Sequence, residues 1–296
     1  MKFSRSCVMR SGVMRIFFVF LIAFVHQSVD LRAELLRIGG ASSVNIPVAA
    51  AAQVLRAEAN MDIQITTSGG SNAGIVAVGE RQAEIGMISR ELVMEDRVEF
   101  PDIDFQTIDL GRQVIALVVS RDVWEGGVRS LSVEQARGIY TKKFTNWKEL
   151  GGPDQKITFF SADEGRGTWE LFAAWVFGST QRAPLGRFPV SMSDKEARNS
   201  VEFTPGAISF MAPKWADGRS TFVLPIKADD GKVLEPVPAT VKAGSYPMVR
   251  PLYLITPGRP VGNALRMIEL LQSERGQQII RDAGYMPAGD MAKAKP

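Results

Sequence analysis

Short apolar runs alternate with helix-forming segments along most of the chain. Strands are predicted at residues 35–38, 63–67 and 85–89, and the stretches between them have helical composition. Residues 113–120, with the sequence QVIALVVS, are apolar at nearly every position, which is typical of a strand buried on both faces. This alternation predicts an α/β fold with mostly parallel strands.

Local signals predict where several elements begin and turn. Pro47 suits the first position of a helix, and the strong helix former AAAAQVLRAEA follows it. Ser132 and Gln135 have the spacing of a capping box for a helix that begins after Ser132. Between residues 221 and 234 the pattern predicts a hairpin with Asp230-Gly231 at its tip.

The N-terminus has the pattern of a secretory signal. Basic residues precede an apolar run at 16–25, which is much shorter than the ~20 apolar residues that span a bilayer. We expect residues 1–33 to be removed near Ala33, which would leave an exported, periplasmic protein.

Removal of this segment changes the charge and the available chemistry. The whole chain has 35 basic and 32 acidic residues, and the segment contains five of the basic and one of the acidic residues. The remainder therefore has 30 basic and 31 acidic residues and a net charge of −1. Composition therefore gives no indication of a nucleic-acid partner. The same segment contains the single cysteine, Cys7, and the single histidine, His26. Without them the protein can form no disulfide, no imidazole or thiolate metal site and no Ser/His/Asp triad, and we expect neither a metal nor a cofactor.

Three strand-to-helix turns are rich in glycine and in hydroxyl side chains. They cover residues 39–43 (GGASS), 68–74 (SGGSNAG) and 164–168 (EGRGT). A helix start offers free N–H groups and a partial positive charge, so each turn can bind an anion. A single turn of this kind is most often an ordinary capped helix start, but three of them together favour oxyanion binding.

Other uses of these turns fit the sequence poorly. The chain contains no GxxxxGK[ST] motif, and GGSNAG lacks the spacing of GxGxxG. Residues 69–73 read GxSxA rather than the GxSxG of a nucleophile elbow, and no histidine is present to activate Ser71.

The order of several motifs resembles that of the shorter phosphate-binding (Pst-type) periplasmic proteins of ABC transporters. The matching segments, which cover nearly all of the chain after the signal, are IGGASSVNIP, SGGSNAGI, AEIGMISREL, LSVEQARGIYTKKFTNWKELGG, EGRGTWELF, TPGAISFM, YPMVRPLYLIT and GYMP. The resemblance implies a type II periplasmic-binding-protein fold, in which two α/β lobes are joined by two crossing strands. It places one lobe at 34–113 plus 252–296 and the other at 114–251.

The resemblance also implies a ligand site between the lobes. The expected ligand-binding residues are Ser42, Ser43, Ser71, Ser89, Arg90, Gly165, Arg166, Gly167 and Thr168. An anion held by both lobes would favour a closed state.

This sequence departs from the family pattern at three positions of the site. Ser89 stands where the best-known members have an aspartate, Ala162 where they have an arginine, and Arg166 where they have a serine. Arg166 or Arg90 could replace the missing guanidinium, and a side chain of Arg166 pointing to solvent is the alternative. The loss of the aspartate predicts weaker discrimination between phosphate and sulfate.

The leading hypothesis is a monomeric, non-enzymatic protein that captures inorganic phosphate for an ABC permease in the membrane. The alternatives are a binding protein or sensor for sulfate, tungstate or molybdate, and a secreted phosphoesterase. The absence of histidine and cysteine argues against the enzyme, because such sites usually recruit imidazole.

Overall fold

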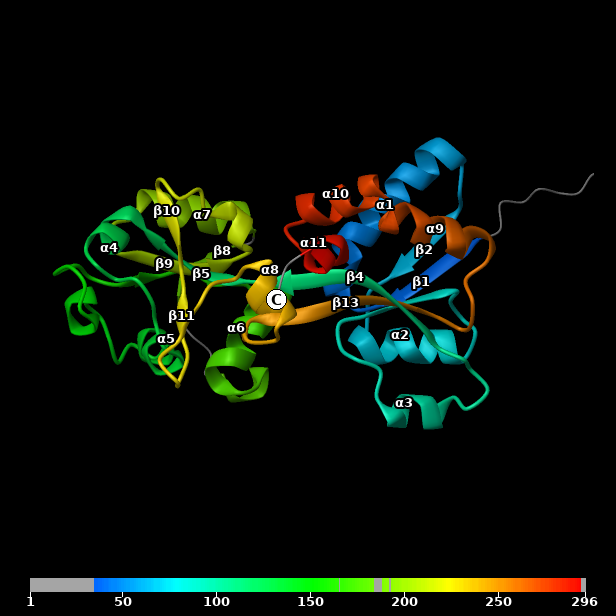
Figure 1. Cartoon of the computed structure of the whole chain (residues 1–296), viewed down its shortest axis with the longest axis horizontal. Coiled ribbons are helices and arrows are strands. Elements are labelled where there is room, and N and C mark those ends of the chain that lie inside the picture. The colour runs from blue at the N-terminus through cyan, green and yellow to red at the C-terminus, as the bar shows by residue number, and fades with distance from the viewer. Residues whose placement is uncertain (1–34, 165, 184–187, 192, 294–296) are drawn as a thin grey trace, which may run out of the picture. The chain divides into compact units, whose positions relative to one another are not determined.

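The structure, a computed structural model, describes residues 35–164, 166–183, 188–191 and 193–293 (Figure 1). The predicted signal segment lies outside these residues. The described residues form two larger sheets, each covered by helices, and two smaller sheets of two strands each, β11-β12 and β7-β8. The predicted α/β fold with two lobes is thereby confirmed.

The first sheet has six strands in the order β14-β4-β13-β3-β1-β2. The strands are β1 (Leu36–Gly40), β2 (Ile63–Thr66), β3 (Ile85–Ile88), β4 (Gln106–Val114), β13 (Val249–Thr256) and β14 (Met286–Pro287). The strand β1 runs parallel to β2 and β3, whereas β13 is antiparallel to β3 and β4. The prediction of mostly parallel strands is therefore correct only for the N-terminal part of this sheet.

Helices cover both faces of the first sheet (Figure 1). They are α1 (Ser42–Ala59), α2 (Gly70–Gly79), α3 (Met94–Glu99), α9 (Gly262–Gln272), α10 (Glu274–Asp282) and α11 (Ala288–Lys293). Apolar side chains of α1, α9 and α10 share a buried cluster with one face of β1 and β3. On the other face, Ile75 and Val78 of α2 pack against Tyr253 and Ile255 of β13.

The second sheet has four strands in the order β10-β5-β9-β6. The strands of this lobe are β5 (Ala116–Ser120), β6 (Thr158–Phe159), β7 (Ser161–Ala162), β8 (Val190–Ser191), β9 (Ala207–Met211), β10 (Thr221–Leu224), β11 (Ile226–Lys227) and β12 (Val233–Leu234). Its helices are α4 (Arg121–Glu125), α5 (Val133–Tyr140), α6 (Gly167–Phe177), α7 (Asp194–Phe203) and α8 (Pro238–Lys242), with 3₁₀ turns at Trp147–Leu150, Thr180–Arg182 and Pro213–Trp215.

The strand β5 is buried on both faces, as the sequence predicts. Leu117 and Val119 point into the core that contains α5 and α6, where Phe172 stacks on Phe210 with ring centroids 4.2 Å apart. Val118 points to the opposite face and packs with α7.

The predicted single strand at 113–120 is divided between the two sheets. Gln113 and Val114 end β4, Ile115 belongs to neither strand, and β5 begins at Ala116. The Ile115 N–H donates to the carbonyl of Met248, which precedes β13, so the two crossing segments are bonded where the chain changes sheets. The sequence does not reveal this break, because residues 113–120 are buried on both sides of it and are therefore apolar at nearly every position. The residue limits of the two lobes stay a prediction.

Two of the three local signals are correct, and one is wrong. The helix α5 begins after Ser132, whose N–H donates to Gln135 Oε1 at 2.9 Å, and β11 pairs antiparallel with β12 around Asp230-Gly231. Pro47, in contrast, does not begin a helix: α1 already begins at Ser42 and contains Pro47 in its interior.

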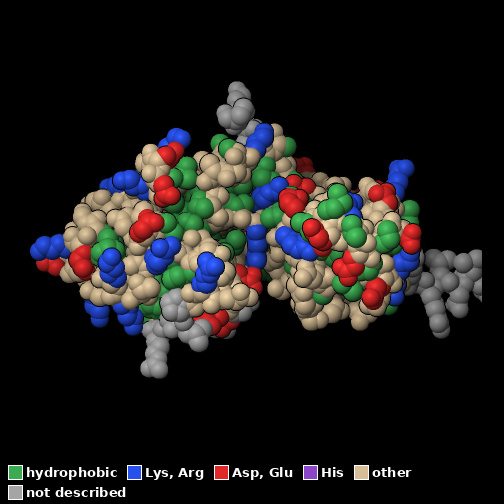
Figure 2. Space-filling model, turned by 90° about the horizontal axis from the view of Figure 1, so that it is seen from below, with side chains coloured by type: hydrophobic (Ala, Val, Ile, Leu, Met, Phe, Trp, Pro, Cys, Tyr) green, Lys and Arg blue, Asp and Glu red, His purple; other side chains and the backbone are tan. Residues whose placement is uncertain are grey.

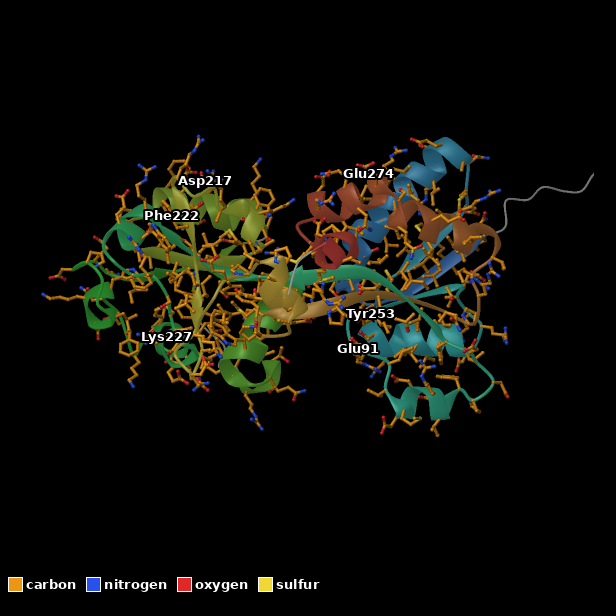
Figure 3. All side chains as sticks on the ribbon, in the orientation of Figure 1. Glu91, Asp217, Phe222, Lys227, Tyr253 and Glu274 are labelled. Carbon is orange, nitrogen blue, oxygen red and sulfur yellow. The ribbon has the colours of Figure 1, made fainter. Side chains whose placement is uncertain are left out.

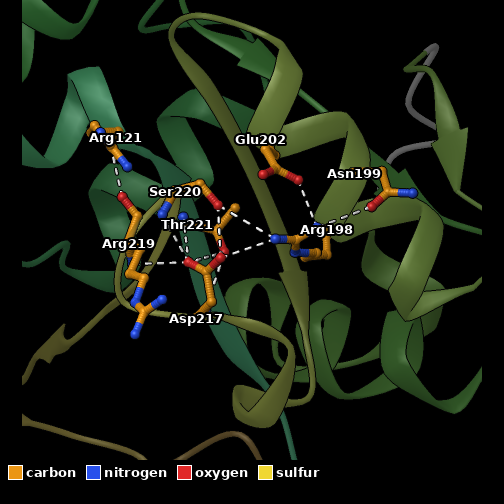
Figure 4. Close-up of polar contacts among 8 residues, drawn as sticks. All are labelled: Arg121, Arg198, Asn199, Glu202, Asp217, Arg219, Ser220 and Thr221. Atoms are coloured by element: carbon orange, nitrogen blue, oxygen red, sulfur yellow. Dashed lines mark hydrogen bonds and ion pairs between the residues drawn. The ribbon is translucent and has the colours of Figure 1, made fainter.

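A carboxylate organises the loop that precedes β10 (Figure 4). Asp217 accepts hydrogen bonds from the backbone N–H groups of Arg219, Ser220 and Thr221 at 2.9, 2.8 and 3.1 Å. It also forms an ion pair with Arg198 of α7 at 2.9 Å. Burial alone would raise the pKa of Asp217, but these hydrogen bonds outweigh it and hold the pKa well below its usual range.

Candidate functional site

Three segments of the first lobe converge at one edge of its sheet. The parallel strands β1, β2 and β3 end there; α1 follows β1, α2 follows β2 after a short turn, and Ser89 follows β3. The carboxyl ends of parallel strands share an edge, which is where such sheets bind ligands. The first two glycine-rich turns and Ser89 are therefore neighbours, as the site prediction requires.

The close approach of these segments depends on Gly40. Its φ is +127°, and a Cβ at this position would lie 2.2 Å from the carbonyl oxygen of Met87 and 3.0 Å from the Cα of Gly74. Next to it, the Ala41 N–H donates to the same Met87 oxygen at 2.8 Å. Only glycine leaves room for the turn to pack directly against β3 and α2.

Ser71 and Ser89 form a contact between the second turn and the end of β3. The backbone N–H of Ser89 donates to Ser71 Oγ at 3.0 Å, and the two hydroxyl oxygens are 3.4 Å apart. Ser71 lies in the first turn of α2, where free N–H groups face away from the helix. The pair thus presents hydroxyl groups beside a helix start.

Arg90 is tied to neighbouring side chains. It forms two hydrogen bonds with Asp96, at 2.6 and 2.8 Å, and a third with Asn72 Oδ1 at 2.8 Å. The hydrogen bonds from Arg90 lower the pKa of Asp96 despite its partial burial. The guanidinium therefore braces the segment after β3 against α2 and α3, and a direct contact of Arg90 with the ligand stays a prediction.

Glu91, the next residue, contacts a crossing strand (Figure 3). The hydroxyl of Tyr253 in β13 donates to Glu91 Oε1 at 2.6 Å, and Arg112 of β4 donates to the same hydroxyl at 3.3 Å. Burial and then the Glu91 hydrogen bond raise the pKa of Tyr253 to about 12. The segment after β3 is thus fixed to both crossing strands.

The interior proline of α1 has a structural consequence at the helix start. Pro47 has no N–H, so the carbonyl of Ser43, four residues earlier, receives no helical hydrogen bond from it. The Tyr285 hydroxyl donates to this carbonyl at 2.8 Å instead. Burial raises the pKa of Tyr285 to about 12, so it stays a neutral donor. Pro47 and Tyr285 together fix the first turn of α1, which also contains Ser42.

The third turn comes from the second lobe and leads into α6. Arg166 is the N-cap residue of α6, and Thr168 is buried in its first turn. The Arg166 guanidinium lies 2.7 Å from Asp194 Oδ1, at the start of α7. Gly165 lies outside the described residues.

A cavity of about 180 Å³ lies at the start of α6 and is lined by residues of both lobes. Residues that line it include Gln113, Arg166, Thr168, Asp194, Trp215 and Tyr285. On the face drawn in Figure 2, Lys and Arg side chains lie beside the central indentation together with Asp and Glu side chains. The structure thus brings Arg166 and Thr168 to Tyr285, the residue that supports the start of α1. The other described residues of the predicted site do not line this cavity: Ser42, Ser43, Ser71, Ser89, Arg90 and Gly167.

Most residues that line the cavity were not predicted from the sequence, and three of them have polar side chains that form hydrogen bonds: Gln113, Asp194 and Tyr285. Gln113 offered a signal, because it is the polar end of an otherwise apolar strand and is only 6% exposed. Asp194 looked like an ordinary acidic residue in a helical first turn. Tyr285 lies in the GYMP motif, but the motif alone does not show which carbonyl it contacts.

The chemistry of this region is that of hydrogen-bond donors and fixed charges. Within the described ranges, no cluster of three or more His, Cys, Asp or Glu side chains could hold a metal ion. Over the same residues, no helix has the length and apolarity needed to cross a membrane. Helix starts, hydroxyls and guanidinium groups suit an oxyanion.

Comparison with known proteins places the chain in a family. The PBP superfamily domain matches residues 27–273, and the chain belongs to this superfamily. Phosphate-binding protein PstS of Bacillus subtilis is 30% identical over 261 residues, which cover 86% of this chain and 81% of the relative. The resemblance to Pst-type phosphate-binding proteins is thereby confirmed.

Solved structures agree with this assignment. A Clostridium perfringens protein crystallised with bound phosphate is 26% identical, with a TM-score of 0.59 over 86% of this chain and 100% of that chain. An ABC-type phosphate transport receptor from Vibrio cholerae has a TM-score of 0.64 at 23% identity, over 85% of this chain and 99% of that chain. The type II periplasmic-binding-protein fold is confirmed.

Proposed function

We propose that this protein captures inorganic phosphate between its two lobes and delivers it to an ABC permease in the membrane. The observation that carries the proposal is the cavity in which Arg166 and Thr168, at the start of α6, face Tyr285, which supports the start of α1. Each helix start offers N–H donors and a partial positive charge to the same anion. The phosphate-binding relatives support phosphate as the ligand.

The proposed ligand-binding residues are those that the sequence indicates. Arg166 and Thr168 line the cavity, and the Ser43 carbonyl accepts a hydrogen bond from Tyr285, which also lines it. Ser71 and Ser89 contribute from the neighbouring edge of the first sheet. An anion bound by both lobes stabilises the closed arrangement, because only that arrangement completes all of its contacts.

Isothermal titration calorimetry of the purified protein with phosphate, sulfate, tungstate and molybdate tests the proposal. We expect one phosphate ion per chain, and micromolar affinity corresponds to about −8 kcal/mol. Trp215 lines the cavity, so its fluorescence is expected to change on binding. Tight binding of another oxyanion with no response to phosphate would identify the ligand as that oxyanion, and no binding of any of the four would refute the proposal.

We further propose that the protein acts by binding alone, as an exported monomer with no nucleic-acid partner. An assay of phosphomonoester hydrolysis tests the first point, and we expect no turnover. Fractionation of cells that express the full-length chain tests export, and analytical ultracentrifugation tests the monomer. Retention of the chain in the cytoplasm would contradict the transport role.

A further inference from the structure

Arg250 lies on the crossing strand β13, and its side chain is only 14% exposed. Its register partner is Gln113, the cavity-lining residue of the other crossing strand. The Arg250 Nε–H donates to Gln113 Oε1 at 2.7 Å, which fixes the plane of the guanidinium. The two strands that connect the lobes therefore carry a largely buried, oriented positive charge.

The guanidinium has a donor group left over. Nη1 donates to Glu170 Oε2 at 2.7 Å, but Nη2 is buried and has no hydrogen-bond partner among the described residues. Burial of a charged donor without an acceptor is costly, so such groups are usually paired. The unpaired Nη2 calls for an acceptor that the protein itself does not supply.

Nη2 lies against the start of α6. A Cβ built on Gly167 would lie 1.7 Å from Nη2, so the guanidinium occupies the space that any other side chain at this position would fill. The N-terminus of an 11-residue helix and a buried guanidinium are both positive. Glu170, in the first turn of the same helix, offsets part of this repulsion through Nη1, and within the described residues Nη2 is left without an anionic partner.

The same place borders the cavity. Arg166 and Thr168, the residues on either side of Gly167, both line it, as does Gln113. Ala162, which stands where the family has its arginine, has no charge to contribute and is 3% exposed. Arg166 and Arg90 were the predicted replacements for this arginine, and neither of them lies on a crossing strand.

We propose that Arg250 supplies the guanidinium that binds the oxyanion, through Nη2 and beside the N–H groups of α6. This inference rests on the proposed function. Glu170 is 48% exposed at the side chain and serves as the counter-ion of Arg250 when no anion is bound. Because Arg250 lies at the start of β13, where the chain enters the first sheet from the second lobe, the anion would be bound at the connection between the lobes as well as by the two helix starts.

Calorimetric titration with inorganic phosphate, at low and at physiological salt, tests the proposal on Arg250→Gln, Arg250→Lys and Glu170→Gln. Arg275→Gln is the matched control, because Arg275 forms an exposed ion pair with Glu58 at 2.7 Å, away from the crossing strands. Circular dichroism and the thermal midpoint without phosphate establish that each variant is folded.

We expect Arg250→Gln to weaken phosphate binding about ten- to hundredfold, as loss of a charge-assisted partner does. Arg250→Lys keeps the positive charge but loses the paired N–H donors of the guanidinium, so its affinity for phosphate is expected to lie between those of Arg250→Gln and the wild type. Glu170→Gln removes a competing carboxylate, so its affinity should equal or exceed that of the wild type. Arg275→Gln should bind as the wild type does.

An Arg250→Gln variant that binds phosphate as tightly as the wild type would overturn this inference and leave the proposed function intact. If that variant does not fold, wild-type affinity in Arg250→Lys would overturn it equally, and so would weakened binding by Glu170→Gln. A wild type that binds none of the four oxyanions would overturn both the inference and the proposed function.

Discussion

The guanidinium of Arg166 lies 2.7 Å from Asp194 Oδ1, and the second oxygen of the same carboxylate accepts the Ala212 N–H at 3.0 Å. The ion pair holds Arg166 at the cavity rather than in bulk solvent, since its side chain is 27% exposed. A guanidinium has five N–H donors, so the contact with Asp194 leaves others for an anion. The alternative of a side chain that simply points to solvent does not fit this geometry.

Arg166→Ala is expected to weaken phosphate binding about ten- to hundredfold, because a charge-assisted partner is lost. It should also lower the thermal midpoint, because Asp194 would lose its cation in a partly buried setting. Calorimetry and thermal denaturation measure the two effects. Arg219→Ala, which removes an exposed charge, is the control, and unchanged phosphate affinity in Arg166→Ala would show that the guanidinium does not bind the ligand.

Ser89→Asp is expected to increase the preference for phosphate over sulfate. At neutral pH phosphate still carries a proton that a carboxylate can accept, whereas sulfate carries none and is repelled. Glu91, the neighbouring carboxylate, is directed toward Tyr253, whose hydroxyl donates to its Oε1 at 2.6 Å. The expected change in the affinity ratio is about ten- to hundredfold.

Competitive titration of the two anions at fixed pH and salt measures this ratio. Ser89→Asn, which has a similar shape and no charge, is the control. A wild type that already strongly prefers phosphate, with nothing added by Ser89→Asp, would indicate that another carboxylate performs the discrimination.

Gly40→Ala is expected to destabilise the fold by more than about 2 kcal/mol, because an L-residue is strained at φ +127° and its Cβ would lie 2.2 Å from the Met87 oxygen. Gly39→Ala is a neighbouring control, since its Cβ would lie 3.6 Å from Ala77 Cβ, an ordinary contact. Urea denaturation compares the two variants. Equal stability of both would contradict the tight packing of the turn.

Asp217→Ala should destabilise the protein by about 1 to 3 kcal/mol at pH 7, because three backbone N–H groups of the loop lose their acceptor. The pKa of Asp217 is lower in the folded protein than in the unfolded chain. Its stabilising contribution is therefore complete above the unfolded value of about 3.9 and is lost as the pH falls toward the folded value. Denaturation of wild type and variant at pH 7 and pH 3 should show a smaller difference at pH 3, whereas the exposed Asp229→Ala should show little at either pH.

The sequence predicted the features that depend on local pattern. The hydrophobic periodicity identified β1, β2 and β3, and the capping box of Ser132 identified the start of α5. Glycine and serine after the strands predicted the turns that converge at one edge. These signals are read within a few residues, so they do not require knowledge of what packs against them.

Features that depend on contacts between distant segments were not predictable in the same way. Pro47 looked like a helix start because the sequence does not show that Tyr285, more than two hundred positions later, satisfies the carbonyl that the proline leaves open. Arg250 stands in the motif YPMVRPLYLIT, and nothing in the motif indicates what its side chain contacts. Its importance appears only when Gln113, Glu170 and Gly167 are seen around it.

The residues that line the cavity include neither imidazole nor thiol, and the chain from residue 35 onward contains no histidine or cysteine. Histidine is the one side chain whose ordinary pKa lies between pH 5 and 8. A titration of affinity across that interval would consequently record the protonation of the anion itself. The charge of the protein's site would stay constant over this interval, while the charge of the bound anion changes. Without a thiol, the site would also respond to neither oxidising nor reducing conditions.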